Sequence, residues 1–266
     1  KIADEAGIPL ILDATFNTPY LLKPLEHGAS IIVHSLTKWI GGHGIAIGGA
    51  VLDGGRFDWG ASDKFPTIAS PHYAMDGINF YEEFGPTAMT AKLRAEMMYN
   101  FGPCLSPTNA FHLLQGIETL PLRMQRHIEN TDALLAYLSA HDDVAWVRHP
   151  HLESHPQHEL AKRLMPKGAG SIITFGVKGG RDAGQAFIEA VELSSHLANV
   201  GDAKTLVIHP ASTTHSHIDP EAMKDGGLSD DMIRLSVGLE DIEDIKADFE
   251  IGFKAAKRRV APRAAE

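Results

Sequence analysis

The sequence predicts an α/β fold built around a mainly parallel sheet. Two short apolar runs, 10–12 and 29–33, have the length and composition of strands, and polar residues follow each of them at once. Apolar runs rich in isoleucine and valine, without alternation, are typical of strands that are covered on both faces. A second series of strand-like runs alternates with helical stretches over 171–258, which indicates a further, smaller α/β unit.

The first third of the chain supplies the strands of the larger unit. We expect a short helix over 1–7, a strand that ends at Asp13, a strand over 29–33 and a strand that closes with the turn 51–55. The segment 56–88 then forms a long excursion that contains several aromatic residues and prolines. Because loops of this length are uncommon without a role, we expect this insertion to be a wall or lid of the functional site.

A long amphipathic helix is predicted over 118–141 and joins two domains, 1–118 and 119–266. Its apolar positions recur at helical spacing, at Leu120, Met124, Ile128, Leu134, Leu135 and Leu138. The remaining predicted elements are helices over 87–100, 107–114, 184–191 and 240–258, strands over 171–177, 205–208 and 233–237, and a frayed tail over 260–266.

Composition narrows the class of protein. The 266 residues are 44% hydrophobic, enough for a sizeable core, and no apolar run has the length of a membrane span. The formal net charge of −10 argues against a nucleic-acid-binding surface. The single cysteine, Cys104, excludes an intramolecular disulfide and suits the cytosol.

The segment Ser35-Leu36-Thr37-Lys38 follows the second predicted strand and carries the strongest chemical signal. A buried ammonium is costly unless it is paired or loses its charge, and a lysine that deprotonates readily is the kind that forms Schiff bases. Two hydroxyls beside such an amine suit a phosphate ester, so the segment suggests a pyridoxal phosphate (PLP) site. Taken alone, the same residues also fit an ordinary capped turn.

Asp13 strengthens this interpretation because PLP needs an acidic partner for its pyridine nitrogen. Asp13 and Lys38 both follow predicted strands of one sheet. In open α/β sheets the carboxyl ends of the strands face the crevice where ligands bind. An aspartate after a strand is also a common turn cap, so the pair is more informative than either residue.

Two histidine clusters raise the alternative of a metal site, His149 to His158 and His209 to His217. A catalytic zinc site needs three well-placed ligands, whereas the first cluster lies in a proline-bearing loop. We therefore expect no metal. The glycines of 41–49 are a weak nucleotide-binding signal, because a strand rather than a helix is predicted after them.

Several longer motifs, in order along nearly the whole chain, resemble the Cys/Met-metabolism family of PLP-dependent enzymes. They are 12–20, 24–29, 33–44, 105–111, 114–124, 199–206, 209–215 and 233–240. The resemblance implies the type I fold of PLP-dependent transferases, with the C-terminal part of the large mainly parallel-sheet domain followed by a smaller α/β domain. The long insertion 56–88 resembles the O-acetylhomoserine sulfhydrylase branch.

That branch implies a PLP-dependent γ-replacement in methionine and cysteine biosynthesis. O-acetylhomoserine and sulfide, or methanethiol, would give homocysteine, or methionine, and acetate. Related alternatives are a methionine γ-lyase or a cystathionine γ-synthase or γ-lyase. An alternative from another class is an inactive fragment or a non-catalytic subunit that needs a companion chain.

The resemblance also implies roles for single residues. Lys38 would hold PLP and act as the general base, and Asp13 would bind the pyridine nitrogen. The remaining positions would be Ser35 and Thr37 at the phosphate, Thr15 at the ring face, and Arg234 and Asn199 at the substrate carboxylate. Two departures stand out: Ala14 occupies a position where the family often has asparagine, and Asn199 replaces the commoner serine.

The resemblance further implies partners. The chain opens on the end of a helix rather than on a first strand, so we expect the N-terminal part of the PLP domain to be missing and a companion segment to exist. The family builds its sites across a dimer and usually pairs dimers, which implies a homotetramer in the cytoplasm.

Overall fold

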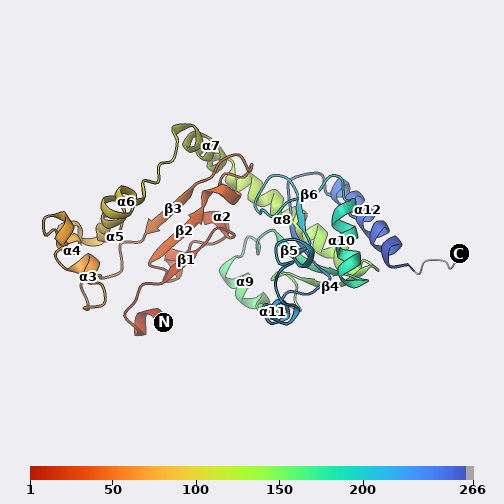
Figure 1. Ribbon diagram of the computed structural model, residues 1–266, viewed down its shortest axis with the longest axis horizontal. Helices are drawn as coiled ribbons and strands as arrows, with labels where there is room; N and C mark the ends of the chain where they lie inside the picture. The colour runs from red at the N-terminus through yellow and green to blue at the C-terminus, as the bar shows by residue number, and fades with distance from the viewer. Residues whose placement is uncertain (262–266) are drawn as a thin grey trace.

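The computed structural model describes residues 1–261 and contains two sheets connected by a helical segment (Figure 1). Most of the predicted tail, residues 262–266, lies outside the described residues. The first sheet has the order β1-β2-β3 and the second has the order β4-β5-β8-β7-β6. Within residues 1–261, no helix combines the length and apolar character needed to cross a bilayer.

The first sheet consists of β1 (Ile11–Asp13), β2 (Ile31–Ser35) and β3 (Gly49–Asp53). β1 and β2 are parallel, whereas β3 runs antiparallel to β2, so this sheet is mixed rather than mainly parallel. The physical reason is the connection 36–48, which holds a tight turn and lacks the crossover helix that parallel neighbours need. Central strand β2 is mostly buried, as its sequence predicts, and the two outer strands are more exposed.

Short elements flank this sheet. α1 (Ile2–Glu5) leads into β1, and α2 (Thr18–Leu21) follows it. The insertion 56–88 contains α3 (Pro66–Ala69) and α4 (Phe80–Phe84). The helix predicted over 87–100 follows it as α5 (Ala88–Lys92), a π turn over 93–98 and α6 (Tyr99–Phe101). The aromatic residues of the insertion pack on one another and on Ile31, which makes a small core of its own.

The insertion begins at the end of the sheet that lies away from Lys38. Antiparallel pairing sets Asp53 opposite Ile31, at the start of β2, while Lys38 follows the other end of that strand. Figure 1 shows α3–α6 far from the second sheet. That the insertion forms a wall or lid of a functional site stays a prediction. Because the insertion lies far from Lys38 of its own chain, the site that it covers would have to be a different one.

Two helices connect the sheets, α7 (Pro107–Glu118) and α8 (Leu120–Ala140). Ser106 caps α7, since its Oγ accepts a hydrogen bond of 3.1 Å from the Asn109 N–H. α8 begins at the predicted boundary and runs between the two sheets (Figure 1). It packs on the turn after β2 and on β4 and β5, so one helix belongs to both units. The division at 118/119 stays a prediction.

The second sheet comprises β4 (Val144–Arg148), β5 (Ile172–Val177), β6 (Ser195–His196), β7 (Leu206–Ile208) and β8 (Met232–Ser236). Only β6 and β7 are parallel. Helices α10 (Gly180–Ala190) and α12 (Ile242–Val260) lie side by side and bury Phe187 and Phe249 against Phe175 of β5. α9 (His158–Leu164) and α11 (Pro220–Asp225) are peripheral. Strands β4 and β6 and helix α9 lacked a sequence signal.

Asp248 on α12 ties the loop after α10 to the core. Its buried carboxylate accepts hydrogen bonds from the backbone N–H groups of Glu192, Leu193 and Ser194, at 2.6, 2.9 and 2.9 Å. We expect Asp248→Ala to lower the free energy of unfolding by about 3 kcal/mol, because it removes the partner of these three donors. Urea denaturation measures the loss.

Asp244→Ala is the matched control, since Asp244 lies exposed on the same helix. Its expected effect is about 0.5 kcal/mol or less. Equal losses for the two variants would contradict the role given to Asp248.

Candidate active site

Lys38 lies in a π turn, 36–40, that follows β2 directly. The Gly41 N–H donates to the Leu36 carbonyl at 2.8 Å, and the Gly42 N–H donates to the Lys38 carbonyl at 2.7 Å. Lys38 itself departs from helical geometry, with φ −91° and ψ −133°. π turns of this kind are rare and often occur at functional sites. The sequence signal located the lysine but not this backbone shape.

The Lys38 side chain reaches across to the second unit of the chain. Its Nζ donates a hydrogen bond to Oδ1 of Asn199, a residue in the loop between β6 and β7. Nη2 of Arg234, on β8, donates to the Asn199 backbone oxygen at 3.3 Å. The structure therefore brings together three of the predicted site residues, although they are far apart in the sequence.

The surroundings of Lys38 favour its neutral amine. Burial is the main cause that lowers the pKa of Lys38 below that of an ordinary lysine, and the positive charge of Arg234 lowers it further. A lowered pKa is what a lysine needs to act as a nucleophile or general base near neutral pH. Burial also lowers the pKa of Arg234, although a guanidinium keeps its charge in a protein.

Asp13 ends β1 beside β2 and remains ionised. The side chain and the backbone N–H of Thr15 bond to its carboxylate, the latter at 2.9 Å, and these bonds lower the pKa of Asp13. The buried Thr15 hydroxyl in turn accepts a bond of 2.8 Å from the Ser35 N–H. An ionised carboxylate next to the lysine turn suits a cationic group such as a protonated pyridine nitrogen.

The two hydroxyls predicted at the cofactor phosphate differ in their surroundings. The Thr37 hydroxyl is engaged with Gly48, whose N–H and carbonyl lie 3.1 and 3.3 Å away. Ser35 is half-buried and bonds to the fold through its backbone N–H. The Lys38 amine, the Asp13 carboxylate as an acceptor and the Ser35 hydroxyl as a donor fit PLP, and Thr37 would have to share its hydroxyl.

The turn after Lys38 packs closely on the second unit. Trp39 is fully buried, and its Nε1 donates to Ser171 Oγ at 2.9 Å. Gly201 has φ +74°, and a Cβ there would stand 2.6 Å from Trp39. The Ala203 N–H donates to the Gly42 carbonyl at 2.8 Å. The sequence analysis did not predict this packing. The glycines at the contact, Gly42 and Gly201, were the sequence feature that could have indicated a close approach of the two segments.

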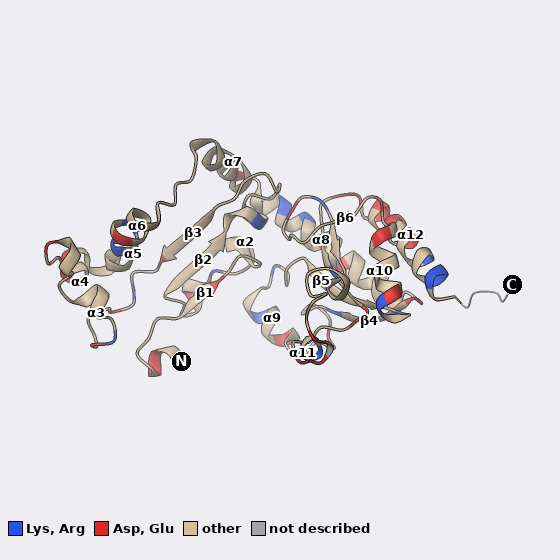
Figure 2. Ribbon diagram, viewed as in Figure 1, with Lys and Arg blue, Asp and Glu red and all other residues tan. Residues whose placement is uncertain are grey.

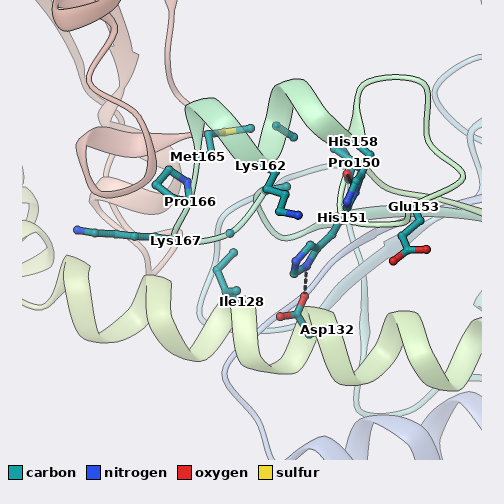
Figure 3. Close-up of a pocket in the computed structure, with 13 residues that line it drawn as sticks. Ile128, Asp132, Pro150, His151, Glu153, His158, Lys162, Met165, Pro166 and Lys167 are labelled. Carbon is teal, nitrogen blue, oxygen red and sulfur yellow. Dashed lines mark hydrogen bonds and ion pairs between the residues drawn. The ribbon is translucent and has the colours of Figure 1, made fainter.

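The first predicted histidine cluster lies elsewhere, and two of its members, His151 and His158, line a cavity of about 540 Å³ between α8, α9 and the loop that precedes α9 (Figure 3). His151 Nδ1 pairs with Asp132 Oδ1 at 2.6 Å, and His158 Nδ1 donates to the Pro150 carbonyl at 3.1 Å. Across residues 1–261, no group of three or more His, Cys, Asp or Glu side chains is placed to hold a metal ion.

The chain matches the profile of the Cys/Met metabolism PLP-dependent enzymes over residues 1–254, and it belongs to that family. It is 48% identical over 96% of its length to sulfhydrylase FUB7 of Gibberella moniliformis, covering 60% of that protein. It is 47% identical over 96% of its length to homocysteine synthase of Schizosaccharomyces pombe, again covering 60%. The chain thus spans about three fifths of the length of the curated relatives it matches.

Solved structures agree with this assignment and confirm the predicted type I fold. A Campylobacter jejuni chain described as an O-acetylhomoserine (thiol)-lyase, with PLP joined to a lysine as N′-pyridoxyl-lysine-5′-monophosphate, superposes with a TM-score of 0.90. The two share 34% identity over 95% of this chain and 60% of that chain. A cystathionine γ-synthase of Xanthomonas oryzae gives a TM-score of 0.75 at 32% identity, over 97% of this chain and 58% of that one.

The charge of Arg234 should be measurable at Lys38 without any cofactor. Because Arg234 lowers the pKa of Lys38, we expect Arg234→Gln to raise that pKa toward the ordinary lysine value. The pH dependence of Lys38 acetylation by limiting acetic anhydride, followed by mass spectrometry, reports it.

Arg258→Gln, in the exposed last turn of α12, serves as the control and should leave the Lys38 titration unchanged. A Lys38 pKa that is equal in wild type and Arg234→Gln would show that the two cations do not interact.

Proposed function

We propose that this chain supplies the catalytic lysine of a PLP-dependent enzyme that replaces the γ-substituent of an activated homoserine with sulfur. The observation that carries the proposal is the position of the Lys38 amine. It bonds to Asn199, with Arg234 bound to the same residue and an ionised Asp13 on the neighbouring strand. This arrangement provides an amine, a carboxylate-binding cation and an acidic partner at one junction.

The proposed cofactor contacts use four residues besides the lysine. Asp13 would bind the pyridine nitrogen, Ser35 and Thr37 would donate to the phosphate, and Thr15 would lie against the ring. Bound PLP supplies an electron sink for the negative charge that develops at the substrate Cα. The ionised state of Asp13, maintained by Thr15, supports its part.

The substrate contacts follow from charge and shape. Arg234 would bind the α-carboxylate through its planar fork, and Asn199 would orient that group. The Lys38 amine would remove the Cα proton and then move protons so that acetate leaves Cγ. Sulfide takes the place of acetate, so O-acetylhomoserine and hydrogen sulfide give homocysteine and acetate. Methanethiol in the same role would give methionine.

The names of the curated relatives support a sulfhydrylase over other reactions in the family. Eight curated relatives with names of the sulfhydrylase or homocysteine synthase kind are 43 to 48% identical to this chain. Among the solved structures, the O-acetylhomoserine (thiol)-lyase is 34% identical and the cystathionine γ-synthase is 32% identical. Methionine γ-lyase and cystathionine γ-synthase or γ-lyase chemistry differ in the leaving group and the nucleophile. They are therefore separated by assay rather than by the lysine site, which they would share.

A companion segment and assembly into a cytoplasmic dimer of dimers complete the proposal. Outer strands of the first sheet expose apolar side chains, with Ile11 at 56% and Val51 at 48% exposure. Figure 2 shows β2 and β3 almost free of charged residues. An apolar sheet surface of this kind is usually covered by other polypeptide. A non-catalytic subunit would need the same cover over this surface, so the exposed apolar side chains do not separate that alternative from the enzyme.

Lys38→Ala tests the central residue in the complete enzyme. Loss of the amine should abolish the visible absorbance of lysine-bound PLP and lower homocysteine formation from O-acetylhomoserine and sulfide at least about 1000-fold. Lys204→Ala, which changes a lysine in the second unit, is the control and should keep both signals.

Competing substrates then separate the alternatives. Ketobutyrate from methionine in place of homocysteine would identify a γ-lyase, and cystathionine from cysteine would identify a γ-synthase. A complete wild-type assembly that shows no PLP absorbance would overturn the enzyme assignment.

A further inference from the structure

A stripe of three buried polar residues runs along one face of α8. Arg123, His127 and Asn130 are spaced four and three positions apart, so they lie on the same side of the helix. Their exposed fractions are only 6%, 0% and 2%. Burying polar groups is costly unless they are hydrogen-bonded, so the partners of this α8 stripe indicate what it does.

Arg123 holds the turn that carries Lys38. Its Nη1 donates to the Trp39 carbonyl at 2.6 Å, and its Nη2 donates to the Ile40 carbonyl at 3.0 Å. Nη2 also donates to the Gly116 carbonyl at 2.6 Å, which ties the end of α7 to the same turn. A Cβ at Gly42 would stand 2.1 Å from Nη1, so the turn and the guanidinium are in direct contact.

His127 and Asn130 hold the backbone that follows Arg234. Nδ1 of His127 donates to the Val237 carbonyl at 2.7 Å. Nδ2 of Asn130 donates to the carbonyls of Gly238 and Glu240, both at 3.0 Å. Val237 and Gly238 continue directly from β8, the strand that carries Arg234.

We infer that the α8 stripe is a positioning device that sets Lys38 and Arg234 at a fixed separation. One rigid helix binds the backbone just after the lysine and the backbone just after the arginine. Small displacements of reacting groups cost large factors in rate, about 100-fold for 1 Å. These contacts of the stripe go to backbone carbonyls and not to the side chains proposed to bind cofactor or substrate, so its residues are positioning rather than catalytic residues. This inference rests on the proposed function.

The two ends of the stripe should affect different kinetic constants in the complete enzyme. Arg123→Lys keeps the charge but loses the planar fork, so the lysine turn loosens, and we expect kcat to fall about 10-fold or more with a small change in KM. Asn130→Ala loosens the chain after Arg234, and we expect KM for O-acetylhomoserine to rise about 10-fold with a smaller loss in kcat. Arg126→Lys, on the exposed face of the same helix, should change neither constant.

A second measurement separates positioning from general stability and does not need the cofactor. With PLP removed, the acetylation titration of Lys38 should shift to higher pH in Arg123→Lys, because a loosened turn exposes the amine and moves it away from Arg234. Asn130→Ala and Arg126→Lys should leave the lysine turn, and hence its solvation, closer to wild type. Circular dichroism and urea denaturation identify conditions in which all variants are folded.

Folded Arg123→Lys and Asn130→Ala proteins with unchanged kcat, KM and Lys38 titration would overturn the inference, even if their stability fell. If wild type forms no homocysteine, the proposed reaction fails, while the cofactor-free Lys38 titration still decides whether Arg123 positions the amine.

Discussion

The docking of the Lys38 turn on the second unit is the contact on which the rest of this structure depends. Trp39 is buried against Gly201, and Arg123 binds the carbonyls that follow the lysine. Because the turn is held on both sides, the Lys38 amine meets Asn199 in the loop that precedes β7. Without this docking, the lysine would follow a small mixed sheet and would not meet Asn199.

The electrostatics of the junction follow from the same geometry. Burial and the nearby Arg234 lower the pKa of Lys38, and hydrogen bonds from Thr15 lower the pKa of Asp13. The lowered pKa of Lys38 favours a neutral amine, and the lowered pKa of Asp13 favours a charged carboxylate. A PLP enzyme needs this pair of states at one pH, because the amine reacts while the carboxylate keeps the pyridine nitrogen protonated.

The first sheet contrasts with this well-packed junction. Its central strand is covered, but the edge strands expose apolar side chains, and the aromatic insertion packs mainly on itself. The second sheet, with Phe187 and Phe249 packed on Phe175, has a complete core. The difference agrees with the proposal that further polypeptide covers the first sheet.

Local sequence patterns determined the elements that have a strong local cause. Apolar runs predicted β1, β2, β5, β7 and β8, and helical spacing predicted α8 and α12, each within a few residues. Lys38 and Asp13 could be predicted as site residues because a strand end, a hydroxyl pair and an acidic partner are all local signals. The family resemblance added Asn199 and Arg234 as substrate contacts.

Only the tertiary structure decided how these pieces meet. The antiparallel direction of β3 depends on a connection that contains no crossover helix, and the course of the insertion follows from it. The roles of Arg123, His127 and Asn130 depend on backbone carbonyls far away in the chain. The local sequence around these residues therefore predicts only the polar face of an amphipathic helix. Long-range hydrogen bonds carry no local signature, which is why the sequence could predict the lysine but not what holds it in place.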